Sequence, residues 1–108
     1  MGTVKVKGIT VNLGGDDYVI PPISLGALEQ LKDRLSSFTG NVNDAMQVST
    51  VIDAVFAALR RNYPEITRES VADLIDVGNM CDVMEAVMDV SGLKRKEAES
   101  AGETTAGN

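Results

Sequence analysis

The chain has 108 residues, of which 44% are hydrophobic and only 4% aromatic, and it carries a formal net charge of −6. This length supports one domain with one modest core, and the acidity argues against nucleic-acid binding, because phosphate contacts need a basic face. The chain has no apolar run near the roughly 20 residues that span a bilayer and no apolar signal-peptide segment, so a cytoplasmic protein is expected.

The first segment has the pattern of a β-hairpin. Apolar and polar residues alternate over residues 3–13, and a glycine-rich turn signal at Gly14-Gly15-Asp16-Asp17 precedes a second apolar run. Strands are therefore predicted near residues 3–13 and 17–20. Because an isolated two-stranded hairpin is marginal in water, it should either lie on the helices or pair with the edge of another subunit.

A helix is predicted after Pro21-Pro22, which ends the second strand because proline cannot donate a ladder hydrogen bond. Ser24 can cap this helix, which runs to about Ser37. Its narrow apolar stripe consists of Leu28, Leu31 and Leu35. A polar linker over residues 36–43 follows, so the next helix is a separate element.

The stretch from Asn43 to Arg68 contains the central amphipathic helix, against which the rest of the chain should pack. Its apolar face at helical spacing consists of Val48, Val51, Ile52, Val55, Phe56 and Leu59. The opposite face is expected to remain in water and consists of Thr50, Asp53, Ala57, Arg60 and Arg61. Asn62-Tyr63-Pro64 then ends the helix, because proline disfavours helical geometry at the residue before it.

Two short helices are predicted after this corner. Thr67 can cap the first, which runs from Arg68 to Val77, and Gly78 can stop it. Asn79 can cap the second, which runs from residue 80 to 90 and ends before Gly92. The expected fold class is therefore mainly α (α+β), with an N-terminal β-hairpin followed by a bundle of about four helices.

The last segment, residues 94–108, has no large apolar residue. It cannot bury enough surface to offset its ordering entropy, so a disordered tail is expected after a single domain over residues 1–93.

The sequence offers little for catalysis, and we expect no enzymatic activity, cofactor or metal. It has no histidine and no glycine-rich phosphate loop, and its lone Cys81 is expected to be a buried structural thiol. Two acidic stripes could hold a cation or face a basic partner, although solvated helix faces are the commoner explanation. They consist of Glu69, Asp73 and Asp76, and of Asp82, Glu85 and Asp89.

Two groups of residues are candidates for partner binding. Arg60, Arg61 and Tyr63 could form a contact patch at the corner, although two arginines also suit an exposed helix end. Methionine is an adaptable contact residue as well as a gap filler in cores. Met80, Met84 and Met88 could therefore face either the core or a partner.

Several segments, in this order, resemble the tail assembly chaperones of long-tailed bacteriophages. The resemblance spans roughly residues 9–93, and its most specific part is the run from Ala57 to Pro64 followed by Thr67. The supporting segments are Tyr18-Val19-Ile20-Pro21-Pro22, Leu25-Gly26-Ala27-Leu28, Gly78-Asn79 and Val90-Ser91-Gly92.

This resemblance implies a non-catalytic viral protein that binds the tape measure protein and keeps it soluble during assembly of the tail tube. It also implies self-association, a location in the host bacterial cytoplasm and absence from the mature virion. In many members a ribosomal frameshift yields a longer form that recruits the major tail tube protein. The alternative is a structural tail or connector protein that stays in the virion.

Overall fold

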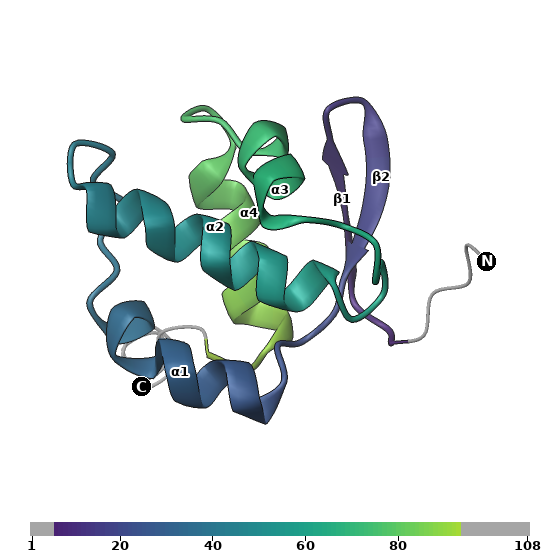
Figure 1. Ribbon diagram of the computed structural model, residues 1–108, viewed down its shortest axis with the longest axis horizontal. Coiled ribbons are helices and arrows are strands. Elements are labelled where there is room, and N and C mark those ends of the chain that lie inside the picture. The colour runs from purple at the N-terminus through teal and green to yellow at the C-terminus, as the bar shows by residue number, and fades with distance from the viewer. Residues whose placement is uncertain (1–5, 94–108) are drawn as a thin grey trace, which may run out of the picture.

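The computed structural model describes residues 6–93 and contains a two-stranded antiparallel sheet followed by four helices in that range (Figure 1). The elements are β1 (Ile9–Leu13), β2 (Asp16–Ile20), α1 (Leu25–Ser36), α2 (Ala45–Leu59), α3 (Arg68–Leu74) and α4 (Met80–Val90). The predicted mainly helical α+β fold is confirmed. The start of the predicted first strand and the predicted disordered tail, residues 94–108, lie outside the described residues.

The hairpin follows from its two glycines. Gly14 and Gly15 have φ values of 64° and 95°, and these left-handed conformations are the ones that a two-residue hairpin turn with the right twist requires. The register pairs Leu13 with Asp16 at the turn and Ile9 with Ile20 at the open end. Since side chains alternate along a strand, this register directs one apolar face of the hairpin towards the helices.

The strand β1 begins later than predicted, because the chain crosses closely over β2 at Gly8. A Cβ atom at Gly8 would lie 1.9 Å from the carbonyl oxygen of Ile20, so no other residue fits there without moving the backbone. Residues 6–8, which precede Ile9, are not part of the ladder.

Helix α2 is the centre of the domain. It contacts α1, α3, α4 and β2, and in Figure 1 it crosses the middle of the molecule, with α1 below it and α4 behind it. The buried apolar residues of all these elements form one cluster. The largest of the fully buried side chains are Leu13, Ile20, Leu59, Met84, Val51, Val55, Val71 and Val87.

The predicted division of α2 into an apolar and a solvated face is wrong in part. Thr50 and Ala57, which were expected in water, are buried. They are covered because α1 packs along this side of α2, whereas Ile52 and Phe56 on the predicted apolar face remain partly exposed. Helical periodicity identified the helix but not which neighbours would cover it.

Most predicted helix ends are confirmed. Ser24 accepts a hydrogen bond from the Ala27 amide, Thr67 and Ser70 form a capping box, and Gly92 follows α4 with a φ of 73°. The predicted end of α3 at residue 77 is wrong, since the helix ends at Leu74. Asn79 stands at the start of α4 without capping it, because its Oδ1 atom accepts from the Asp76 amide instead.

Candidate functional site

The corner after α2 fastens the hairpin to the helices. Asn62 is only 5% exposed, and its Oδ1 atom accepts from the Val6 amide at 2.8 Å. Its Nδ2 atom donates to the carbonyl oxygens of Val6 at 2.8 Å and Val19 at 3.3 Å. One side chain thus meets the hydrogen-bonding needs of two backbone segments that are more than 40 positions away in sequence.

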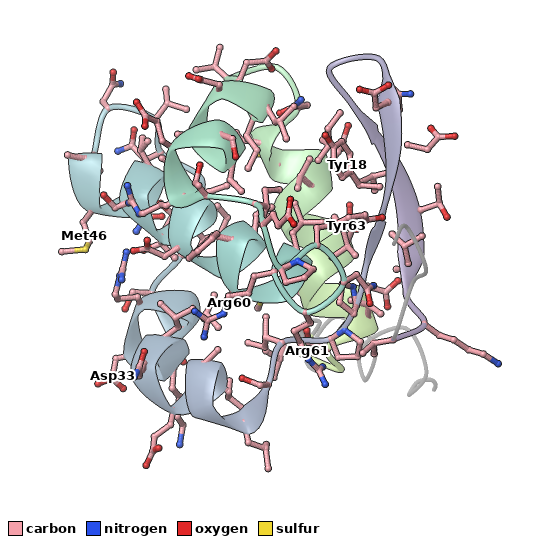
Figure 2. All side chains as sticks on the ribbon, turned by 45° about the vertical axis from the view of Figure 1, so that its right-hand side comes forward. Tyr18, Asp33, Met46, Arg60, Arg61 and Tyr63 are labelled. Atoms are coloured by element: carbon pink, nitrogen blue, oxygen red, sulfur yellow. The ribbon has the colours of Figure 1, made fainter. Side chains whose placement is uncertain are left out.

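Tyr63 and Arg61 extend this attachment on either side. The Tyr63 hydroxyl accepts from the Val19 amide at 2.8 Å, and its ring meets that of Tyr18 edge to face, with centroids 5.3 Å apart (Figure 2). Arg61 donates from Nη1 to the carbonyl oxygen of Pro22 at 2.6 Å. The hairpin therefore lies on the helices, the first of its two predicted arrangements.

The six predicted contact residues are not equivalent in their surroundings. Met80 and Met84 belong to the buried core, and Met88 is half-buried against it. Arg61 and Tyr63 are half-buried at the corner, where Tyr63 bonds the Val19 amide of β2 and Arg61 donates one hydrogen bond to the Pro22 carbonyl just after β2. Only Arg60 is exposed.

Other apolar side chains reach the surface. Figure 2 shows Met46 projecting outward from the start of α2, where it is 57% exposed. Sequence reasoning missed it because it precedes the apolar stripe of that helix. Within residues 6–93 the exposed large apolar side chains are Leu25, Val42, Met46 and Val77.

The acidic stripes and Cys81 give no catalytic or metal centre in the described part of the chain. Cys81 is exposed, so its predicted burial is wrong; it lies next to Met80 but off the core-facing side of α4. Asp76 accepts from the amides of Gly78 and Asn79 and thereby shapes the turn before α4. No group of three or more Cys, Asp or Glu side chains between residues 6 and 93 could hold a metal ion.

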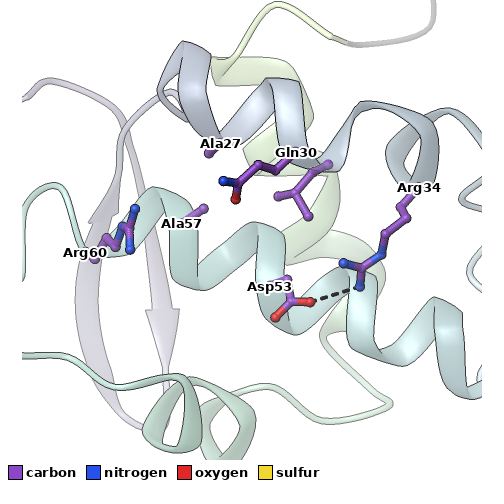
Figure 3. Close-up of a pocket in the computed structure, with 7 residues that line it drawn as sticks. Ala27, Gln30, Arg34, Asp53, Ala57 and Arg60 are labelled. Atoms are coloured by element: carbon purple, nitrogen blue, oxygen red, sulfur yellow. Dashed lines mark hydrogen bonds and ion pairs between the residues drawn. The ribbon is translucent and has the colours of Figure 1, made fainter.

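A groove of about 310 Å³ lies between α1 and α2 (Figure 3). The side of α1 that faces it contributes residues one helical turn apart, and α2 supplies the opposite wall. The lining residues are Ala27, Gln30, Leu31, Arg34, Asp53, Ala57 and Arg60. Because two alanines stand where longer side chains would meet, the helices leave a hollow with an apolar floor and a polar rim.

Arg34 and Asp53 close one end of the groove. Arg34 Nη2 lies 2.9 Å from Asp53 Oδ2, and Arg34 Nε donates to the buried Thr50 hydroxyl at 3.2 Å. Asp53 Oδ1 also accepts from Arg68 of α3 at 2.5 Å. Burial raises the pKa of Asp53, but the hydrogen bonds and charges of Arg68 and Arg34 outweigh it, so that its pKa lies below the ordinary value.

Arg60 stands at the other end of the groove, as Figure 3 shows. Its guanidinium carbon lies 5.7 Å from the centroid of the Phe56 ring, a distance suited to a cation–π contact. Among residues 6–93 no carboxylate pairs with it. At one end of the groove, Arg34 shares the Asp53 carboxylate with Arg68, and at the other end Arg60 has no carboxylate partner within residues 6–93.

Sequence reasoning did not find this groove or the role of Asn62. An asparagine before Tyr-Pro is a common turn residue, and alanines in a helix suggest only helix propensity. The one available signal was Gly8, since an isolated glycine in a strand pattern often marks a close backbone approach.

Comparisons with protein-family models, with curated proteins and with solved structures found no match. No helix within the described range is both long and apolar enough to cross a membrane.

Proposed function

We propose that this chain is a non-catalytic tail assembly chaperone of a bacteriophage, which binds the tape measure protein reversibly and keeps it soluble while the tail tube forms around it. Its place of action would be the host cytoplasm, and it would be absent from the finished virion. A longer, frameshifted form that recruits the major tail tube protein belongs to the same proposal.

The observation that best supports this proposal is that the segments behind the family resemblance meet in space. The segment Tyr18–Pro22 accepts hydrogen bonds from Arg61 and Asn62 of the most specific segment and donates one, from the Val19 amide, to Tyr63 of that segment. Ser91, from a third segment, accepts from the Ile23 amide at 3.1 Å. Residues that contact one another in a fold are expected to recur together in a family. Segments that resembled a family only by chance would not be expected to contact one another.

The surface suits reversible binding of a long polypeptide. Exposed apolar side chains offer contact area at separate places, and the unbranched Met46 can adapt to different client side chains. A net charge of −6 favours solubility of a coated complex. The chaperone would act by covering client surface, with no bond made or broken.

Co-expression tests the proposal directly. The chain is produced in bacteria together with the tape measure protein encoded near it, and the soluble fraction of that client is measured against co-expression with an unrelated acidic protein of similar size. We expect the soluble fraction to rise and the two chains to elute together. An unchanged soluble fraction would count against the chaperone function.

Mass spectrometry of purified virions separates the alternative. Abundant peptides from this chain in finished particles would favour a structural tail or connector protein over a chaperone.

A further inference from the structure

We infer that the outer edge of β1 is a dimerisation surface, on which β1 of a second copy of this chain pairs antiparallel, so that the two hairpins form one continuous sheet. This inference goes beyond the proposed function, because it concerns contacts between copies of the chain and involves no client. Three features carry it: the different state of the two hairpin edges, the uncharged sequence of β1 and the symmetry of the register.

The two edges of the hairpin are not equivalent. The corner covers the edge of β2, where the Val19 amide donates to the Tyr63 hydroxyl at 2.8 Å and the Val19 carbonyl accepts from Asn62 at 3.3 Å. Thr10 lies opposite Val19 in the register, and two residues opposed in this way direct their backbone groups away from each other. The backbone groups of Thr10, and of Asn12 two positions further on, therefore point outward from β1.

The outer edge of β1 has no such cover in the described part of the chain. Within residues 6–93, no element forms a hydrogen bond to the outward backbone groups of Thr10 or Asn12. Both residues are exposed, and in Figure 1 the hairpin forms one side of the domain. Unpaired backbone groups on an edge strand are a ready template for a further strand.

The sequence of β1 does not prevent such pairing. Edge strands that stay unpaired are usually protected by lysine, proline or an inward-pointing charge. β1 reads Ile-Thr-Val-Asn-Leu, which has none of these and is rich in residues that favour strands. Because the whole chain carries a net charge of −6, an uncharged edge is a favourable place for two copies to meet.

β1 is complementary to itself in one symmetric register. When Val11 lies opposite Val11 of the second copy, Thr10 of each chain faces Asn12 of the other, and all their outward amides and carbonyls gain partners. The two Val11 side chains, each half-buried against its own core, then cover one another. Thr10 and Asn12 pair on the opposite, polar face of the sheet.

Antiparallel pairing also brings opposite charges together. Lys7 lies just before β1, Asp16 and Asp17 lie just after the turn that follows it, and all three are exposed. In the symmetric dimer the end of β1 near Lys7 lies beside the acidic turn of the second copy, and this occurs at both ends of the interface. Two five-residue strands form an interface well below about 1,200 Å², so we expect a reversible dimer.

Hydrogen exchange of the full chain at several concentrations tests the pairing directly. The amides of Thr10 and Asn12 should exchange more slowly as the concentration rises, while sedimentation shows the mass doubling. The Val11 amide is the internal control and should change much less, because it bonds to Tyr18 across the hairpin in both states. A chain that stays monomeric up to about 1 mM, or a dimer in which Thr10 and Asn12 still exchange fast, would overturn the inference.

Two variants of the edge should weaken the dimer without removing the hairpin ladder. Thr10→Pro deletes one outward donor from each copy, and Thr10 contributes no bond to the ladder with β2, so dimerisation should weaken at least about tenfold. Thr10→Lys combined with Asn12→Lys keeps every backbone donor but places lysines opposite one another across the interface, which should also weaken it.

Gln30→Lys combined with Ser36→Lys is the matched control for the lysine variant, because both residues are exposed on α1 and the net charge changes equally. A net charge nearer zero reduces the repulsion between copies, so this control should dimerise at least as tightly as the wild-type chain. Unchanged dimerisation of both edge variants would show that the copies meet at another surface and would overturn the inference. These measurements use the chain alone, so their outcome is independent of the proposed function.

Discussion

Arg60 and Arg61 are neighbours in sequence but serve two different regions of the molecule. Arg61 bonds the backbone at Pro22 and, together with Asn62 and Tyr63, fixes the hairpin. Arg60 points to the groove, rests on Phe56 and has no acidic partner among residues 6–93. The same short motif therefore contains residues that build the fold and one, Arg60, whose charge no carboxylate among residues 6–93 pairs, and only the structure separates them.

A cavity in the core beneath both regions should cost the most stability. Leu59 is fully buried, and Leu59→Ala should lower the free energy of unfolding by about 2–5 kcal/mol, because it leaves a cavity. Urea denaturation measures this loss. Leu25→Ala is the control, since Leu25 is 83% exposed and its loss should stay within about 0.5 kcal/mol. Similar values for both variants would contradict the position of the core.

Asn62→Ala tests whether this side chain holds the hairpin to the helices. Removal of this amide leaves the Val6 amide and the carbonyls of Val6 and Val19 without their partner, which should cost about 2–4 kcal/mol. Hydrogen exchange at the Val19 amide should also accelerate as the hairpin loosens. Asn12→Ala removes an exposed amide bonded to Asp17 and should cost far less. If the two losses were equal, Asn62 would not be the fastening point.

Asp53→Asn tests the closed end of the groove and should cost about 1 kcal/mol near pH 7, since two arginines lose their ionised partner. The lowered pKa of Asp53 means that folding favours the charged carboxylate. Its contribution is therefore present above the ordinary pKa of about 4 and is lost as the pH falls through the folded value.

The difference in unfolding free energy between wild type and Asp53→Asn should accordingly shrink below about pH 4. Denaturation curves at several pH values measure this difference. A gap that stays constant down to about pH 2 would show that the ion pairs do not stabilise the fold.

Local chemistry made the elements predictable. Ser24 and Thr67 mark helix starts by their side-chain acceptors, and Gly14-Gly15 marks the hairpin turn by its left-handed backbone. These features depend on residues within a few positions of one another. The order and type of the elements could therefore be derived without knowledge of the packing.

Tertiary packing determines which side chains are buried, and this could not be derived from the sequence pattern. Thr50 and Ala57 are buried because α1 lies over them, and a periodic pattern does not specify which partner covers a small residue. The methionine pattern left open whether Met80 and Met84 face the core or a partner, and the packing of α4 places both in the core. The role of Asn62 depends on bonds across more than 40 positions, beyond the reach of local patterns.

The most direct test of the separation between the two regions compares Arg60→Gln with Arg61→Gln, measuring urea stability and the soluble fraction of co-expressed tape measure protein for each. Arg61→Gln should lower stability by about 1–2 kcal/mol through its lost bond to Pro22, with client binding per folded molecule unchanged. Arg60→Gln should leave stability within about 0.5 kcal/mol and reduce the soluble client. The reverse pattern, or equal effects on both measurements, would contradict the account.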